Sequence, residues 1–337
     1  GILADDMGLG KTLQMIAHIL ARVEAGDIKP TLVVCPASLV YNWTAELERF
    51  APSLDVCAIV GAKAQRRVQI AGVAEHNVVV TSYDLMRRDI DEYVEQDFAR
   101  VVLDEAQYIK NPLTQVARAA KRLPAGVRFA LTGTPIENRL SELWSIFDFL
   151  MPGFLGSYER FRERYELGII GEDEEAAARL RALIEPFVLR RRKADVLTDL
   201  PAKFEGIRYV PLSREQRRLY DGAEQRLRED LNVQKRQNAS RANRRGHIPD
   251  AEKSAVEVLA ELTRLRQIAL DPSLVFENYK GGAEKLGAIM ELVDEAMEAG
   301  RKVLVFSQFT SYLDVVAAEL DRRGIAHFAI TGATPKR

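Results

Sequence analysis

The sequence has few of the side chains from which zinc sites and disulfide frameworks are built. Its 337 residues include only two cysteines and four histidines. Cys35 and Cys57 lie in apolar stretches without a CxxC pair, and the histidines lack the spacing of metal ligands or of a catalytic triad. We therefore expect two reduced core cysteines and no metal site built on cysteine or histidine.

Long apolar runs and an excess of one charge are also missing. No apolar run reaches about 18 residues, and no basic segment precedes an apolar one at the start, so neither a membrane span nor a signal peptide is expected. The expected location is cytoplasmic and nucleoid-associated for a prokaryotic source, or nuclear for a eukaryotic one. Lys+Arg 48 against Asp+Glu 49 give a net charge of -1, so nucleic-acid binding would need a local basic groove.

Short apolar segments alternate with amphipathic helical segments in the first part of the chain. Residues 31–36, 77–83, 100–107 and 127–135 are rich in valine and leucine and are each followed by polar residues. This pattern predicts an α/β fold with a parallel sheet covered on both faces. The sequences DEAQ and TGTP follow two of these strands, at the sheet edge where open α/β sheets bind ligands.

The pattern changes after residue 144 to long charged helical stretches, and strand-like segments return only at 205–212, 302–309 and 327–332. The predicted division is a first lobe over 1–189 with a helical protrusion at about 144–187, a linker over 190–204, and a partial second lobe over 205–337 with a helical insertion at about 213–270. Because both ends are abrupt, we expect a piece of a longer protein that acts as a monomer.

The sequence DDMGLGKT, at residues 5–12, approaches the phosphate-loop pattern GxxxxGKS/T, with Asp5 in the slot of the first glycine. Glycines allow the backbone N–H groups to approach phosphate oxygens, Lys11 would neutralise the β- and γ-phosphates, and the Thr12 hydroxyl would bind magnesium. A surface turn before a helix is the alternative interpretation. The predicted ATP-binding residues are Met7, Gly8, Leu9, Gly10, Lys11 and Thr12.

A second acidic element supports the nucleotide interpretation. Asp104 and Glu105 end the apolar strand VVLDEAQ, where the aspartate would hold magnesium with Thr12 and the glutamate would act as general base on the attacking water. Alone, this would be an ordinary acidic strand end. Together with Lys11 it predicts a P-loop NTPase that uses ATP and Mg²⁺, with Glu105, Lys11 and Asp104 as catalytic residues.

A series of collinear blocks then resembles the SWI/SNF-type ATPases of helicase superfamily two. The blocks are GILADDMGLGKTLQ, LVVCPASLVYNWTAELERF, VVTSYDLMRRD, VVLDEAQYIKNP, ALTGTPIENRLSELWSIFDFLMP, LRRRKADVLTDLPAK and KVLVFSQFTSYLDVV. The resemblance accounts for Asp5, which that family usually places there. It implies tandem RecA-like lobes, here with the second incomplete, that hydrolyse ATP in response to double-stranded DNA and translocate along it. It also implies a DNA-bound protein as a remodelling target.

The resemblance further implies roles for single residues. Gln107, Thr132 and Thr134 would couple the ATP site to DNA. The DEAQ form, where most relatives have DEAH, favours a prokaryotic source, and the arginine that completes the active site would lie beyond Arg337. The implied DNA contacts are Pro36, Ala37, Ser38, Ser82, Tyr83, Lys110 and Asn111 in the first lobe and Gln308, Phe309 and Thr310 in the second.

Some interpretations stay open. The protein could be a helicase that separates strands, or a module that binds ATP or DNA without turnover. The basic run LRRRKADV, at residues 189–196, fits a clamp on phosphates or a solvated linker face equally well. Besides its coupling role, TGTP could also begin a helix, with Thr134 as its cap.

Overall fold

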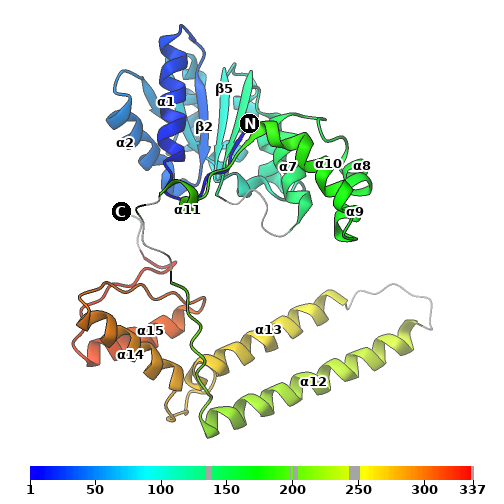
Figure 1. Ribbon diagram of the computed structural model, residues 1–337, viewed down its shortest axis with the longest axis vertical. Helices are drawn as coiled ribbons and strands as arrows, with labels where there is room; N and C mark the ends of the chain where they lie inside the picture. Colours follow the sequence, from blue (N-terminus) through cyan, green and yellow to red (C-terminus); the bar gives the residue numbers. More distant parts are fainter. Residues whose placement is uncertain (134–138, 198, 200–203, 243–250, 335–337) are drawn as a thin grey trace. The chain divides into compact units, whose positions relative to one another are not determined.

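The computed structural model describes residues 1–133, 139–197, 199, 204–242 and 251–334. It divides into two compact units, Gly1–Ala202 and Lys203–Arg337, which are described separately below (Figure 1). The lobe and linker boundaries predicted from the sequence remain predictions.

A parallel sheet forms the centre of the first unit. Within the described residues it has seven strands in the order β3-β4-β2-β5-β6-β1-β7, and every recorded pairing is parallel. This confirms the predicted α/β fold. The strands are β1 (Ile2–Leu3), β2 (Thr31–Cys35), β3 (Val56–Ala58), β4 (Val78–Ser82), β5 (Arg100–Asp104), β6 (Val127–Leu131) and β7 (Val188–Leu189).

Helices cover both faces of this sheet, as the continuous apolar strands require. Val33 and Val102 pack with α1 (Lys11–Glu24) and α2 (Val40–Phe50), whereas Leu32 and Leu103 pack with the helices of the opposite face. Figure 1 shows α1 and α2 on one side of β2 and β5, and α7 on the other. The other helical segments around the sheet, on either face, are η1 (Ala37–Leu39), α3 (Lys63–Ala71), η2 (Val73–Glu75), α4 (Tyr83–Arg88), α5 (Ile90–Tyr93), η3 (Ala106–Ile109), α6 (Gln115–Arg122) and α7 (Leu140–Leu150).

The segment from 158 to 187 is mostly helical and falls within the protrusion predicted at about 144–187, whose bounds remain a prediction. Phe161, Tyr165 and Leu180 are buried in the same core as the sheet residues, so this protrusion is anchored to the first unit. Its elements are α8 (Tyr158–Phe161), the π-helical turn η4 (Arg162–Glu166), α9 (Leu167–Ile170), α10 (Glu174–Ile184) and η5 (Glu185–Phe187), with α11 (Lys193–Val196) following β7.

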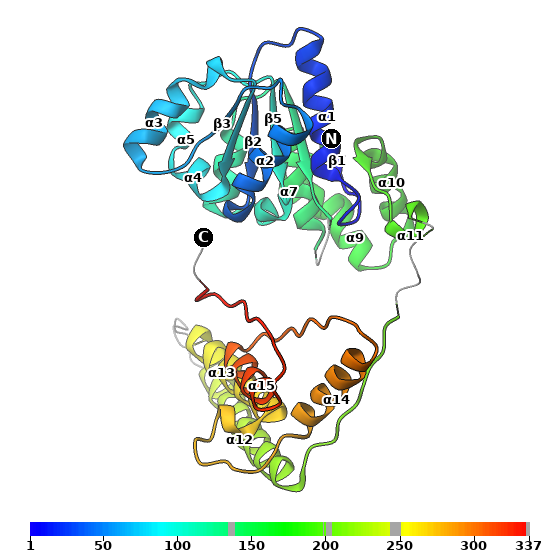
Figure 2. The ribbon, with the colours of Figure 1, turned by 90° about the vertical axis from the view of Figure 1, so that its left-hand side faces the viewer.

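The second unit is helical. Its elements are α12 (Arg214–Ala242), α13 (Ala251–Leu270), η6 (Pro272–Leu274), α14 (Glu284–Glu298) and α15 (Thr310–Arg322). Met290 and Val293 of α14 pack against Tyr312 and Val316 of α15. Figures 1 and 2 show α12 and α13 lying side by side, where the buried Gln216 Nε2 donates to the carbonyl oxygen of Ile268 at 2.9 Å.

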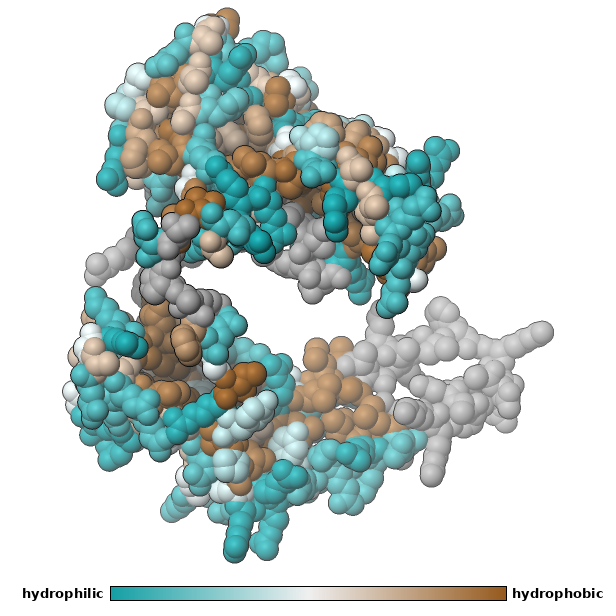
Figure 3. All heavy atoms as spheres, viewed as in Figure 1, coloured by the Kyte–Doolittle hydropathy of each residue, from teal (hydrophilic) through white to brown (hydrophobic). Residues whose placement is uncertain are grey.

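The strands expected at 205–212, 302–309 and 327–332 are a wrong prediction. No strand occurs among the described residues of the second unit, and Leu304, Phe306 and Phe328 are 82%, 88% and 102% exposed. A strand needs a hydrogen-bonded neighbour, which apolar composition alone does not supply. Apolar residues are also exposed along α13, where Val256 and Leu259 face solvent (Figure 3). Among the described helices, none is long and apolar enough to cross a bilayer.

A buried ion pair ties α3 to the turn before α5. Arg66 Nε and Nη2 donate to the two carboxylate oxygens of Asp89 at 2.5 and 2.9 Å, and Nη1 donates to the carbonyl oxygen of Gly61 at 2.7 Å. Both side chains are nearly inaccessible to solvent, at 6% and 3% exposure. The hydrogen bonds to Asp89 raise the pKa of Arg66, which therefore stays charged.

We predict that Asp89→Ala lowers the free energy of unfolding of the first unit by about 3–5 kcal/mol, because it leaves a buried guanidinium without its counterion. Asp91→Ala is the matched control, since Asp91 is 82% exposed and pairs with Arg122 at the surface; its effect should stay below about 1 kcal/mol. Urea unfolding followed by the fluorescence of Trp43 and Trp144 measures both. Equal losses in the two variants would contradict the prediction.

Candidate active site

The strand order brings three loops of different chemistry to one edge of the sheet. Because all strands are parallel, the loops that follow β1, β5 and β6 leave from the same edge. β6 lies between β1 and β5, so Thr132 stands between the loop that begins at Ala4 and the acidic pair at the end of β5. These are the positions that the sequence predicts for phosphate, magnesium and coupling.

The loop after β1 has the backbone of an anion site. Gly8 and Gly10 have φ angles of 86° and 73°, a left-handed conformation that glycine adopts without strain. α1 begins at Lys11, and no side chain caps its N-terminus, so first-turn N–H groups can bind an anion. Lys11 Nζ donates to the carbonyl oxygens of Asp5 at 2.8 Å and Asp6 at 3.3 Å, folding the loop around its ammonium group.

The Asp104 carboxylate is fixed from two sides. Its Oδ2 accepts a hydrogen bond from Trp43 Nε1 at 2.8 Å, and its Oδ1 accepts one from the Glu105 backbone N–H at 3.0 Å. The Tyr83 hydroxyl donates to the Asp104 carbonyl oxygen at 2.8 Å. Burial raises the pKa of Asp104, and the hydrogen bond from Trp43 opposes that rise. Trp43 stands in a block that carries the family resemblance, but nothing in that block indicates which group its indole N–H contacts.

Three side chains form a hydrogen-bonded relay beside Asp104. Thr132 Oγ1 donates to Gln107 Oε1 at 2.9 Å, and Gln107 Nε2 donates to Glu105 Oε2 at 2.7 Å. Glu105 itself has a φ of 51°, a left-handed conformation that is uncommon outside glycine and clusters at functional sites. The structure thus joins the predicted base to two of the predicted coupling residues. Thr134, the third, lies outside the described residues.

Comparison with known proteins agrees with this geometry. Residues 1–274 match the family model of the SNF2-related domain. The chain belongs to the SNF2-related family. An uncharacterized ATP-dependent helicase of Mycoplasma genitalium is 36% identical over 98% of this chain and 30% of its own length. The TATA-binding protein-associated factor mot1 of Schizosaccharomyces pombe is 43% identical over 65% of this chain and 12% of its own.

A solved structure shows the same family likeness. The Sulfolobus solfataricus SWI2/SNF2 ATPase core in complex with double-stranded DNA matches with a TM-score of 0.57 and 34% identity, over 95% of this chain and 65% of that chain. The chain spans about a third or less of the length of the curated relatives named above.

The SNF2-related chain offers oxygen ligands that fit magnesium. Thr12 supplies a hydroxyl and Asp104 a carboxylate, and Mg²⁺ prefers oxygen ligands, with one or two carboxylates completed by substrate phosphates and water. Among the described residues, no cluster of three or more His, Cys, Asp or Glu side chains could hold a metal alone. This donor set therefore suits an ion that arrives with a phosphate ligand.

The DNA contacts expected in the first lobe fall into two groups. Ala37 and Ser38 are exposed in η1, which follows β2, and Asn111 is exposed in the loop that follows η3, with Pro36 and Lys110 half-buried beside them. Lys110 Nζ lies 3.8 Å from Glu142 Oε1.

Ser82 and Tyr83 form the second group and are buried. Ser82 Oγ accepts from the Leu85 N–H and so caps α4, while the Tyr83 ring stacks on Tyr108 at 4.7 Å between centroids. The side chains of Ser82 and Tyr83 thus make contacts inside the first unit. A contact with DNA remains a prediction for all seven residues.

The expected contacts of the second unit lie just before and at the start of α15. Gln308 is exposed, and its Oε1 accepts from Arg266 Nη2 at 2.6 Å. Phe309 is half-buried against α14 and α15, and Thr310 is exposed. Contact of these three residues with DNA also remains a prediction.

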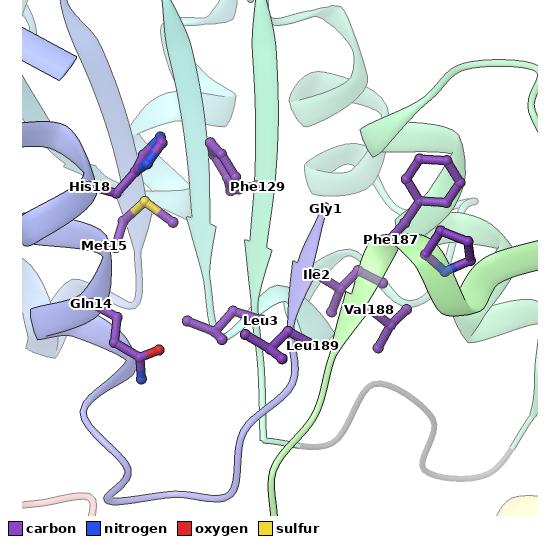
Figure 4. Close-up of a pocket in the computed structure, with 11 residues that line it drawn as sticks. Gly1, Ile2, Leu3, Gln14, Met15, His18, Phe129, Phe187, Val188 and Leu189 are labelled. Carbon is purple, nitrogen blue, oxygen red and sulfur yellow. The ribbon is translucent and has the colours of Figure 1, made fainter. Parts of the chain in front are cut away.

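An apolar pocket of about 490 Å³ lies on the α1 side of β1, β6 and β7. Figure 4 shows Met15 and His18 on α1, Phe129 on β6, and Leu3 and Leu189 lining it. His18 contacts Phe129 edge-on at 5.2 Å, and burial lowers its pKa. Sequence reasoning did not find this pocket. Its apolar lining is unsuited to phosphate, which separates it from the loop of Lys11.

We predict that Trp43→Phe raises the Mg²⁺ concentration needed for half-maximal nucleotide binding by about tenfold, because loss of a hydrogen bond to a metal-binding carboxylate typically weakens metal affinity 10- to 100-fold. Trp144→Phe is the matched control. It removes an indole N–H that donates to the Gly156 carbonyl oxygen at 3.1 Å, away from Asp104. Titration of Mg²⁺ against a fluorescent ATP analogue measures both, and equal shifts would show that Trp43 acts only through packing.

Proposed function

We propose that this chain is the motor core of a DNA-stimulated ATPase that translocates along double-stranded DNA and acts on DNA-bound proteins. The observation that carries the proposal is the meeting of the phosphate loop, Asp104 and the Glu105 relay at one sheet edge. Family membership supports the ATPase, and the structural relative bound to double-stranded DNA supports the substrate.

The residues divide the chemistry as follows. Lys11 leaves the carbonyl oxygens of Asp5 and Asp6 to neutralise phosphate charge, and the N–H groups of Gly10 and α1 bind phosphate oxygens. Thr12 and Asp104 would hold Mg²⁺, which would offset negative charge on the bound phosphates. Glu105 orients the attacking water and takes its proton.

The relay connects the end of β6 to the proposed base. Gln107 fixes one carboxylate oxygen of Glu105, and Thr132 fixes Gln107. A shift of the loop after β6 therefore moves Thr132, changes the hydrogen bond to Gln107 and reorients Glu105. This supports the coupling role proposed for Gln107 and Thr132. For Thr134, which lies outside the described residues, the same role is proposed from the family resemblance alone.

The proposed partner is the backbone of double-stranded DNA. Small polar side chains and backbone N–H groups commonly bind DNA phosphates without reading sequence, and Ser38 in η1 and Asn111 in the loop after η3 present such groups at the surface. Relatives named as TATA-binding protein-associated factors support a DNA-bound protein as the target. The proposed location is the one expected from the sequence: cytoplasmic and nucleoid-associated for a prokaryotic source, or nuclear for a eukaryotic one.

We predict that Lys11→Ala or Glu105→Gln in the full-length protein lowers DNA-stimulated ATP hydrolysis more than tenfold, a barrier increase of at least about 1.4 kcal/mol. Lys63→Ala is the control, because Lys63 is an exposed lysine at the start of α3. Steady-state phosphate release with and without duplex DNA is the measurement. Retention of more than about a tenth of the activity in either site variant would overturn the assignment.

A strand-separating helicase is the second candidate, favoured by the relative named an ATP-dependent helicase. We expect the full-length protein to displace the third strand of a DNA triplex when ATP is present, and to leave a forked duplex paired. A translocase on duplex DNA needs only to track the backbone, whereas a helicase must break base pairs. Unwinding of the fork at a rate comparable to triplex displacement would favour the helicase.

A further inference from the structure

The basic run that follows β7 lies directly against the phosphate loop. β7 pairs in parallel with β1, and the pairing continues beyond both strands. The Ala4 N–H donates to the Leu189 carbonyl oxygen at 2.7 Å, and the Asp6 N–H donates to the Arg191 carbonyl oxygen at 3.0 Å. Residues 189–193 therefore lie alongside residues 4–6 and are hydrogen-bonded to their backbone.

Arg191 provides the counterion of the buried Asp5. The Asp5 side chain is 0% exposed, and its carboxylate accepts hydrogen bonds from the Arg191 backbone N–H at 2.9 Å and from Arg191 Nε at 3.1 Å, with Nη2 also in contact. Gln14 Nε2 donates to the same carboxylate at 3.3 Å. Burial alone would raise the pKa of Asp5, but the hydrogen bonds from Arg191 and Gln14 outweigh it and lower the pKa. The loop thus carries a fixed, fully paired negative charge.

Asp5 and Asp6 are held from opposite sides. From within the loop, Lys11 Nζ binds both of their backbone carbonyl oxygens. From outside, Arg191 binds the Asp5 carboxylate and the Lys193 N–H donates to Asp6 Oδ2 at 3.0 Å. Lys193 Nζ also lies 3.2 Å from where a Cβ on Gly8 would stand. When Lys11 turns to a phosphate, residues 5 and 6 lose its two hydrogen bonds, and the remaining contacts are the outer ones from Arg191 and Lys193 together with the longer hydrogen bonds from Gln14 Nε2 to Asp5 and from the Leu9 N–H to Asp6, both at 3.3 Å.

The neighbouring arginine behaves differently. Arg192 Nε donates to Asp195 Oδ2 at 2.9 Å, and these side chains are 68% and 54% exposed. Arg191 alone in this stretch reaches the Asp5 carboxylate among the described contacts. The run is therefore neither a uniform phosphate clamp nor a uniformly solvated face, which were the two interpretations left open by its sequence.

We propose that Arg191 is a positioning residue of the nucleotide site: through Asp5 it holds the first half of the phosphate loop in place while Lys11 binds phosphate. The proposal rests on the proposed ATPase function and deepens it. By thermodynamic linkage, nucleotide binding must stabilise the contact of residues 189–193 with the loop as much as that contact favours the nucleotide. The contact of residues 189–193, which precede the second unit in the sequence, therefore becomes more stable when nucleotide binds.

The test compares Arg191→Gln with Arg192→Gln, which removes the same charge one residue away. In the first arm, without nucleotide, hydrogen exchange should be faster at the amides of residues 4–10 in Arg191→Gln and unchanged in Arg192→Gln. In the second arm, Arg191→Gln should bind a fluorescent ATP analogue about tenfold more weakly, and Arg192→Gln within about twofold of the unmodified chain. Arg191→Lys keeps the charge but loses the forked geometry, so its affinity should be intermediate.

A third arm uses the unmodified chain alone. Added ATP analogue should slow hydrogen exchange at residues 189–193, a change that a purely structural ion pair would not show. In the full-length protein, Arg191→Gln should raise KM for ATP and leave kcat at saturating ATP within about twofold, as expected for loss of binding that is equal in ground and transition states.

Each result has one consequence. Equal affinity of Arg191→Gln and the unmodified chain, or equal weakening in Arg192→Gln, overturns the role of Arg191 while leaving the ATPase proposal intact. Unchanged exchange at residues 189–193 on addition of nucleotide also overturns it. Failure of the unmodified chain to bind any nucleotide overturns both proposals together.

Discussion

The position of β6 between β1 and β5 is the constraint on which the site depends. It sets one strand between the phosphate loop and the acidic pair, and the parallel direction of all three strands places their following loops on one edge. The gap left by the intervening strand is filled by Thr132, whose hydroxyl reaches Gln107. A different strand order would separate the same motifs, however well each matched its own pattern.

Two buried aspartates at this edge show opposite electrostatic solutions. Asp5 has a guanidinium partner, and its pKa is lowered. Asp104 receives only neutral donors, the Trp43 indole and a backbone N–H, among its described hydrogen bonds, and burial raises its pKa. A buried carboxylate without a paired cation is costly. That cost falls when a divalent cation binds, so Asp5 suits a structural role and Asp104 suits an ion that comes and goes with the substrate.

Local pattern and family resemblance together predicted much of this site, and its limits have a physical origin. The strand ends at Asp104 and Leu131 and the turn around Gly8 follow from short runs of sequence. The contact of Asp5 with Arg191 spans 186 positions and exists only because β7 pairs with β1, which no local pattern reveals. The hydrogen bond from Trp43 to Asp104 could not be predicted for a similar reason. An apolar helix face predicts that the indole is buried, but not which group accepts its N–H. The three false strands of the second unit have apolar sequence without partners.

The left-handed backbone conformation of Glu105 is enforced by the contacts around it. A left-handed conformation at a non-glycine residue costs about 1–3 kcal/mol and persists only where its surroundings enforce it. Here the Glu105 N–H is bound by Asp104 Oδ1, its carbonyl oxygen accepts from the Tyr108 N–H at 3.1 Å, and its side chain is bound by Gln107. The strand therefore ends in a sharp turn that separates the roles of adjacent carboxylates. Asp104 stays buried under α2, while Glu105 turns toward the relay from β6, so different parts of the fold position the proposed base and the proposed metal ligand.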